Sequence, residues 1–281
     1  MSKAYILYNP LAGGGKIRNE LDVFEIVIPN EVCYVDLTAS EALGRVLQAL
    51  EEDDYLILCG GDGTLNRFAN DTTHQNIENE ILYYPCGTGN DFALEFGRHY
   101  GDNPFVITDY LKSLPSVTVN GKSYRFLNGV GFGIDGFCCQ EGDRLRQIPE
   151  KKVNYTQIAI QGLLGKYKPT GATVCVDGQT HRYEKVWIAP TMHGVYYGGG
   201  MKPAPKQKRG SDTLSLMVFH DSSKIRTLMI FPSIFKGTIE KYKKYVSIFP
   251  GREITVTFDA PRPLQIDGET VENVISYTAR R

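Results

Sequence analysis

Four acidic residues stand beside glycines or in predicted turns instead of on a charged helix face: Asp62, Asp135, Asp212 and Glu269. Transfer of a phosphoryl group needs positioning, charge neutralisation by Mg²⁺ and a carboxylate that accepts a proton. Because Mg²⁺ is commonly bound by one or two carboxylates with carbonyls and water, a few scattered acids suffice. Taken alone, each of these acids is more simply explained as a residue that favours a turn. Their chemistry therefore depends on the segments around them.

Asp62 lies in the segment CGGDGTLN, residues 59–66. The apolar run 55–59 before it is typical of a buried parallel strand, and the apolar spacing after it predicts a short helix. The glycines then form a strand-to-helix turn, where backbone N–H groups attract phosphate. A carboxylate there repels phosphate unless a metal or a substrate proton intervenes, which favours phosphoryl transfer. The alternative is an ordinary Asp-Gly turn.

Two more glycine-rich loops follow predicted strands, at 9–16 (NPLAGGGK) and 86–93 (CGTGNDFA). The first is not a P-loop, because Pro10 replaces the first glycine of that motif and Ile17 replaces its final Ser or Thr. Taken alone it is compatible with a flexible turn. In open α/β sheets, however, ligands bind beyond the carboxyl ends of the strands. Three such loops therefore predict one phosphate-binding edge.

The chain changes character near Ser116. Before it, strands and helices alternate, including a helix at 41–50 for which Ser40 is a good N-cap, so a parallel sheet is expected. After it, β-forming runs flank Asn-Gly and Asp-Gly dipeptides, which indicates antiparallel hairpins with a few helices at 155–164 and 225–239. We therefore expect an α/β domain over residues 1–116 followed by a mainly β domain.

The composition and net charge of the chain exclude some classes of function. The chain has 281 residues and a net charge of −1, so it has no general attraction for nucleic acid. No apolar run approaches the roughly 18–20 residues of a membrane span, and the N-terminus carries no signal-peptide pattern. Six cysteines, including the pair Cys138-Cys139, fit reduced thiols better than disulfides or zinc. A cytoplasmic protein without a transmembrane segment is expected.

The three glycine motifs together resemble the diacylglycerol kinase catalytic domain family, which includes sphingosine, ceramide and bacterial lipid kinases. Asp135, Asp212 and the run 267–269 fall where that family continues, so the resemblance covers nearly the whole chain. It implies a three-layer α/β nucleotide-binding domain at 1–116, a β-sandwich domain at 117–276 and an active site in the inter-domain cleft. It also implies a tail, 277–281, that returns to the first domain.

The resemblance further implies roles for individual residues. Glu269 would accept the proton of a lipid hydroxyl, while Asp62 would hold Mg²⁺ or phosphate, or act as the base as in sphingosine kinases. Asp135 and Lys166 would be cleft residues. The nucleotide site would comprise Asn9, Pro10, Leu11, Ala12, Gly13, Thr38, Gly60, Gly61, Asp62, Gly63, Thr64, Leu65, Asn66 and Thr88.

A second, structural Mg²⁺ site is implied at Asp212, with the main-chain oxygens of Arg209 and Leu214. Two departures concern it. Bacterial members commonly have glycine where this chain has Thr213, and serine often stands where Arg209 does. A backbone ligand tolerates such changes.

The implied activity is ATP- and Mg²⁺-dependent transfer of the γ-phosphoryl group to a lipid hydroxyl, foremost that of diacylglycerol. A lipid acceptor implies peripheral contact with a membrane, and a homodimer is compatible with the sequence. The alternatives are an NAD kinase or phosphofructokinase-like enzyme, or a nucleotide-binding regulatory module without turnover. Two basic runs could face anionic lipid: Lys202, Lys206, Lys208 and Arg209, and Lys236, Lys241, Lys243 and Lys244.

Overall fold

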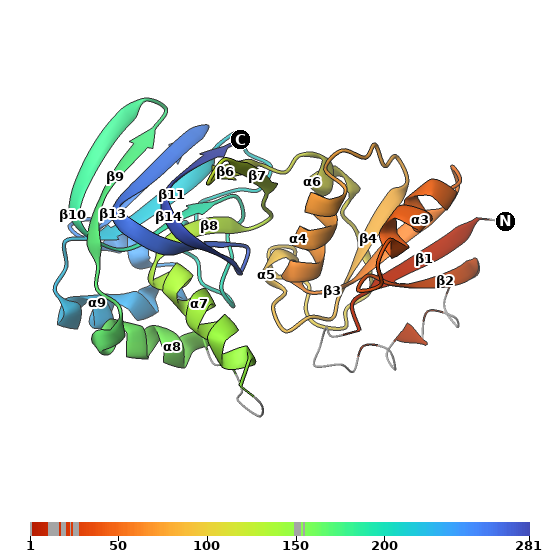
Figure 1. Ribbon diagram of the computed structural model, residues 1–281, viewed down its shortest axis with the longest axis horizontal. Helices are drawn as coiled ribbons and strands as arrows, with labels where there is room; N and C mark the ends of the chain where they lie inside the picture. Colours follow the sequence, from red (N-terminus) through yellow and green to blue (C-terminus); the bar gives the residue numbers. More distant parts are fainter. Residues whose placement is uncertain are drawn as a thin grey trace. The chain divides into compact units, whose positions relative to one another are not determined.

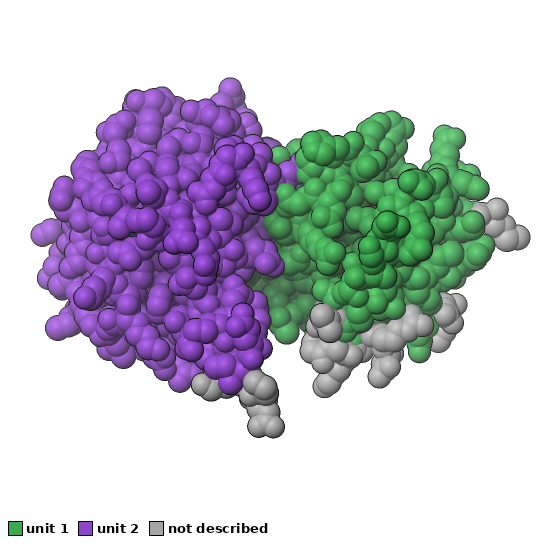
Figure 2. Space-filling model, viewed as in Figure 1, with its two compact units in different colours: residues 1–114 green, residues 115–281 purple. Residues whose placement is uncertain are grey.

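The structure is a computed structural model that describes residues 2–10, 17, 21–22, 24, 28–148, 153 and 155–281. It divides into two compact units, residues 1–114 and 115–281, coloured green and purple in Figure 2. The division falls two residues before the boundary expected at Ser116. Each unit is described by itself below.

The first unit contains a five-stranded sheet in the order β2-β1-β3-β4-β5 (Figure 1). The first four strands are parallel, as expected, and the short edge strand β5 pairs antiparallel with β4. The strand order reverses between β1 and β3, where a crevice forms in open α/β sheets. The strands are β1 Lys3–Tyr8, β2 Glu31–Asp36, β3 Tyr55–Gly60, β4 Glu80–Pro85 and β5 Phe105–Val106.

Both faces of this sheet are covered. Ile57 and Cys59 of β3 pack with Ile17 and Leu21 in one apolar cluster. Leu56 and its neighbour Leu58 are fully buried and point to the opposite face, because side chains alternate along a strand. The expected three-layer arrangement is therefore confirmed. The helices described in this unit are α3 Ala42–Ala49, α4 Asp62–Asp71, α5 Asp91–Leu94 and α6 Thr108–Lys112.

The start of α3 differs from the expectation. Ser40 does not cap it: the helix follows Glu41, whose backbone is left-handed with φ of 59° and whose side chain makes no capping hydrogen bond. Ser40 lies one position too early to occupy the N-cap.

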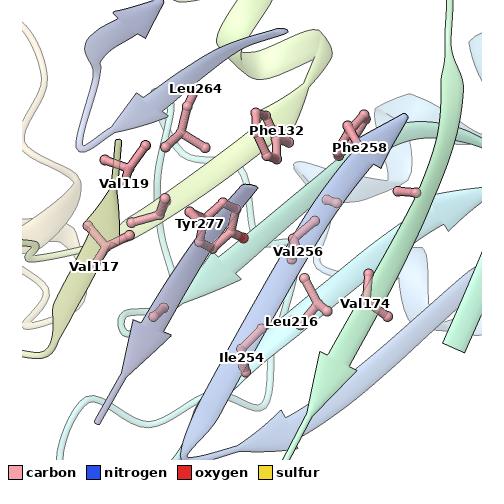
Figure 3. Close-up of a cluster of buried hydrophobic side chains, with 14 of the residues drawn as sticks. Val117, Val119, Phe132, Val174, Leu216, Ile254, Val256, Phe258, Leu264 and Tyr277 are labelled. Atoms are coloured by element: carbon pink, nitrogen blue, oxygen red, sulfur yellow. The ribbon is translucent and has the colours of Figure 1, made fainter. Parts of the chain in front are cut away.

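The second unit is a β-sandwich built around two long strands. β10 and β13 each pair with β9 through their first part and with β8 through their last part, so the sheet closes on itself. Figure 3 shows the core, where the Phe132 ring lies 4.6 Å from that of Phe258 and 5.5 Å from that of Tyr277. The strands are β6 Ser116–Val119, β7 Lys122–Arg125, β8 Gly129–Gly133, β9 Thr170–Val176, β10 Gln179–Met192, β11 Leu214–His220, β12 Val246–Gly251, β13 Glu253–Ile266 and β14 Glu269–Arg280.

Three hairpins turn at Asn-Gly or Asp-Gly dipeptides. Asn120-Gly121 and Asp177-Gly178 were predicted, and Asp267-Gly268 forms a third hairpin of the same kind. Both residues of each dipeptide have positive φ, as a type I′ turn requires.

The tail prediction is wrong. Residues 277–280 are the end of β14, which pairs with β6 and β13 inside the second unit. Tyr277 is 1% exposed and its hydroxyl lies 2.8 Å from that of Thr191. Residues 277–280 therefore belong to the sandwich.

Helices cover the outer face of strands β10 and β11. Met217 and Phe219 pack beneath them, whereas Leu216 and Val218 face the sandwich core. The expected helix 225–239 is divided, because Pro232 lacks the N–H that a continuing α-helix needs. The helical elements are α7 Ile134–Arg146, α8 Tyr155–Gln161, the π-helix η2 Gly162–Lys166, α9 Lys224–Ile230, and the 3₁₀ turns η3 Phe231–Ile234 and η4 Ile239–Lys241.

Within the part of the chain that the structure describes, no helix has both the length and the apolar character needed to cross a membrane.

Candidate functional site

The glycine loops after β3 and β4 meet at the carboxyl edge of the first sheet. The Gly60 carbonyl accepts the N–H groups of Cys86 at 2.9 Å and Gly87 at 3.0 Å. In return, the Asp62 N–H donates to the Gly89 carbonyl at 3.0 Å. Two of the three predicted loops therefore converge, directly beside the point where the strand order reverses.

Glycine is required in these loops by close approach of two backbones. A Cβ on Gly87 would lie 2.2 Å from the Gly61 Cα, and one on Gly61 would lie 2.6 Å from the Gly89 carbonyl oxygen. None of these three glycines is among the described positions with positive φ, so backbone conformation is not the reason. The contact leaves no room for any side chain.

The Asp62 carboxylate joins the two loops. It is 9% exposed, and its two oxygens accept the backbone N–H groups of Asp91 at 2.7 Å and Phe92 at 2.9 Å. These are unsatisfied donors at the start of α5. Asp62 thus holds one glycine loop against the other. Its contact with metal or phosphate stays a prediction.

Thr38 lies on a different loop, after β2. Its N–H and hydroxyl both donate to the Asp36 carboxylate at 2.7 Å. Thr38 lines a cavity of about 250 Å³ whose other walls are residues 37–43 and the side chains of Arg67, Phe68 and Asp71. This is a candidate nucleotide cavity within the first unit.

The remaining predicted nucleotide residues fall into three groups. Asn9 and Pro10 follow β1 and are partly exposed, and Thr88 is exposed. Thr64, Leu65 and Asn66 are buried in α4, so the Leu65 side chain belongs to the core. Gly63 belongs to the first turn of the same helix. Leu11, Ala12 and Gly13 lie outside the described residues.

The residues of the predicted second metal site contact other parts of the protein. Asp212 is exposed and forms an ion pair with Arg252, which lowers the pKa of the Asp212 carboxyl. The carbonyl oxygen of Arg209 lies 3.0 Å from Nε2 of buried His193. Leu214 begins β11 opposite Gly251. A metal there would have to displace Arg252.

Clusters of side chains within the described residues do not indicate a metal centre elsewhere. Among the residues that the structure describes, no group of three or more His, Cys, Asp or Glu side chains is placed to hold an ion. The Arg209 side chain is itself buried, with Nη1 2.5 Å from the Leu127 carbonyl and Nη2 2.8 Å from Oδ1 of Asn128.

Glu269 and Asp267 stand on the same hairpin with different surroundings. Asp267 accepts the backbone N–H groups of Asn128 at 2.8 Å and Gly129 at 3.0 Å, which anchors the hairpin to β8. Glu269 is exposed, and its carboxylate makes no hydrogen bond or ion pair with other described residues. The Glu269 carboxylate can therefore accept a proton without breaking a hydrogen bond to the described chain, whereas that of Asp267 cannot.

Asp135 is a buried acid on the first turn of α7, where the sequence indicated a turn. Its Oδ1 accepts the Gly136 N–H at 2.9 Å, while Oδ2 has no partner of good geometry in the described chain. Burial raises the pKa of Asp135 to about 7, although Gln265 and Tyr197 lower it in part. The predicted cleft residue Lys166 ends η2 and is exposed.

Comparison with known families agrees with both units. Residues 3–114 match the diacylglycerol kinase catalytic domain, and residues 128–278 match the YegS C-terminal NAD kinase beta sandwich-like domain. The chain belongs to the diacylglycerol kinase catalytic domain family. The predicted enzyme class, a lipid kinase and hence a phosphotransferase, is confirmed by this membership.

Individual relatives are distant. "Putative lipid kinase YtlR" of Bacillus subtilis (strain 168) is 23% identical over 299 residues, covering 96% of this chain and 94% of that protein. "Diacylglycerol kinase" of Mycobacterium tuberculosis is 27% identical over 250 residues, covering 84% and 79%. The structure titled "Crystal structure of a putative diacylglycerol kinase from Bacillus anthracis str. Sterne" matches with a TM-score of 0.69 at 18% identity, covering 99% and 93%. That likeness concerns the fold.

Replacing Gly87 with alanine should force the two glycine loops apart. The new Cβ would meet the backbone of Gly61 at 2.2 Å, which no side-chain movement relieves. We expect a loss of about 2 kcal/mol or more in the free energy of unfolding, measured by urea titration. Gly44→Ala is the control, since nothing lies within 4 Å of its Cβ and the helix should gain stability. Equal effects of the two changes would contradict the packing argument.

Replacing Asp62 with asparagine should destabilise the first unit. An amide has one acceptor oxygen, so its NH₂ group would face the Asp91 or Phe92 N–H. We expect a loss of about 1–3 kcal/mol in unfolding free energy together with loss of activity. Glu269→Gln should leave the unfolding curve unchanged, because its exposed carboxylate holds nothing in place. An unchanged curve for the Asp62 variant would exclude the bridging role.

Asp135 should make stability depend on pH. The folded state keeps this proton up to about pH 7, whereas an unfolded Asp releases it near 3.8, so the folded state binds more protons between these values. The contribution of Asp135 to stability is then largest below the lower value and is lost as pH rises to the upper one, by at most about 1.4 kcal/mol per pH unit. Buried His193, whose pKa is lowered to about 3, contributes the opposite slope over the lower part of this range, so the test is the difference in unfolding free energy between the unaltered protein and Asp135→Asn, measured by urea titration between about pH 4 and pH 8. That difference should change with pH, whereas exposed Asp53→Asn should leave the pH dependence as it is. A difference that does not vary with pH would contradict the role of Asp135.

Proposed function

We propose that the protein transfers the γ-phosphoryl group of ATP, with Mg²⁺, to the hydroxyl of diacylglycerol and so forms phosphatidic acid. The observation that carries the proposal is the meeting of two glycine loops beside the β1–β3 switch point in a chain of this family. Backbone N–H groups at such a strand-to-helix turn are suited to phosphate oxygens. The name of the Mycobacterium tuberculosis relative supports diacylglycerol as the acceptor.

The nucleotide would lie along the carboxyl edge of the first sheet. Its phosphates would meet the turn at Gly60–Asn66 and the loop at Thr88, and Asn9 would approach from the end of β1. The cavity beside Thr38 is a candidate for the base or ribose, since it follows β2 of the same sheet.

Asp62 fits one ligand position for Mg²⁺ and does not fit the role of base. Both oxygens accept backbone N–H groups, and because an ionised carboxylate has about four lone-pair sites, these two hydrogen bonds are compatible with a bond to a metal. Mg²⁺ needs only one or two carboxylates beside phosphate oxygens and water, and when bound it would neutralise charge on the transferred group. Protonation of Asp62 would place an O–H against an N–H, which opposes a proton-accepting role.

Glu269 is the better candidate for the base. It is exposed at a hairpin, free of competing hydrogen bonds within the described residues, and can take up a proton without disturbing the fold. The proposal therefore requires the predicted inter-domain cleft to bring Glu269 to the phosphate edge. Such an enzyme would act in the cytoplasm at the membrane surface where its acceptor lies.

Replacing Glu269 with glutamine should abolish turnover while leaving ATP binding intact. General-base catalysis contributes about 10²–10⁴-fold, so kcat should fall by that factor with little change in the nucleotide Kd. Transfer of label from ATP to extracted lipids gives the rate, with NAD and fructose 6-phosphate as parallel acceptors. Glu272→Gln, on the same strand, is the matched control.

Two outcomes would contradict this. Unchanged turnover in the Glu269 variant removes it from the mechanism. Labelling of NAD or fructose 6-phosphate, with lipid untouched, replaces the acceptor class.

A further inference from the structure

Two neighbouring helical segments of the second unit expose apolar side chains in pairs. On α8 and η2 these are Ile160 and Leu164, which are 47% and 57% exposed. On α9 they are Ile225 and Met229, which are 72% and 67% exposed. Each pair is spaced i, i+4 and so lies on one helix face. Exposed apolar residues scattered singly are normal, but two aligned pairs are not scattered.

The two pairs belong to one surface. The Lys224 ammonium at the start of α9 donates a hydrogen bond to the Leu164 carbonyl of η2. Figure 1 shows α8 and α9 next to each other on one side of the second unit, and α9 contacts η2 directly. The buried sides of η2 and α9 are fixed in the core by Leu163 and Ile230. We call Ile160, Leu164, Ile225 and Met229 the α8–α9 surface.

The segments that carry this surface, together with the stretch that follows α9, are strongly basic. Residues 155–168 and 221–245 contain two acids, Asp221 and Glu240, and both already have partners: His220 at 3.0 Å and Lys206 at 3.0 Å. The chain as a whole has a net charge of −1, so the excess of positive charge is local. The basic residues of these segments number eight: Lys166, Lys168, Lys224, Arg226, Lys236, Lys241, Lys243 and Lys244.

We propose that the α8–α9 surface docks on an anionic bilayer, with its four apolar side chains in the interfacial region and the lysines facing lipid headgroups. Helices that lie in a membrane interface typically combine exposed apolar side chains with Lys and Arg. Protein–protein interfaces, in contrast, are depleted of lysine. The inference rests on the proposed function, because an acceptor held in a bilayer requires the enzyme to reach it.

Binding to lipid vesicles tests the proposed docking surface without requiring catalysis. The probe is a vesicle of phosphatidylcholine with phosphatidylglycerol, and bound protein is measured by co-sedimentation. The double variant Ile225→Glu, Met229→Glu should bind at least about tenfold more weakly. Ile275→Glu is the matched control, since Ile275 is 49% exposed on β14, away from both helices.

The charge component is tested separately. Lys236→Glu combined with Lys243→Glu should weaken binding to anionic vesicles, and raising the salt concentration should weaken binding of the unaltered protein. Lys122→Glu, an exposed lysine on β7, should have no effect. Vesicles of phosphatidylcholine alone should bind poorly.

Insertion can be observed directly. The only native tryptophan, Trp187, is 3% exposed with its indole N–H donating to the Ser222 carbonyl, so it should not respond to lipid. In Met229→Trp the added indole should shift its fluorescence to the blue on anionic vesicles.

Three outcomes would overturn the proposal: unchanged vesicle binding in the Ile225, Met229 variant, equal loss in the Ile275 control, or dissociation of a lipid-free dimer by the same variant. The last would make the surface a contact between copies of the chain. The double variant should retain kinase activity on short-chain diacylglycerol in detergent micelles. Absence of that activity in every protein, with vesicle binding intact, would refute the proposed function and leave the docking surface standing.

Discussion

The backbone contact between Gly61 and Gly87 is the constraint on which the phosphate-binding edge depends. It allows the loops after β3 and β4 to exchange hydrogen bonds at the Gly60 and Gly89 carbonyls. It also brings Asp62 within reach of the first N–H groups of α5. A single methyl group at either glycine would separate the loops. The glycines thus act through size, and the same contact positions both the backbone donors and the carboxylate.

Local sequence patterns predicted most of the fold. An apolar run followed by a glycine-rich loop identified strands β1, β3 and β4 of the first sheet, and Asn-Gly or Asp-Gly indicated hairpins of the sandwich. Helix α7 was missed because Gly131, Gly133 and Gly136 suggested turns. Its apolar spacing at Ile134, Phe137, Cys138 and Leu145 was nonetheless helical, and the buried Asp135 came with it.

Local sequence patterns could not predict which residues contact the acidic side chains in the folded protein. The sequence marked Asp62 and Asp212 as unusual acids, but their partners lie far along the chain: the N–H groups of Asp91 and Phe92 for one, and the Arg252 guanidinium for the other. The prediction for the tail failed for a related reason. The neighbours of β14 are decided by the closure of the sandwich around Tyr277, which no local pattern shows.

Two carboxylates with opposite surroundings suggest a division of roles. A proton acceptor must change its charge during the reaction, so it should hold little of the fold in place. A carboxylate that keeps its charge can be fixed by backbone N–H groups, and rigid placement then favours electrostatic preorganisation. Asp62 has the second environment and Glu269 the first. Of the two roles that the family offers for Asp62, its contacts therefore favour holding metal or phosphate over accepting the proton.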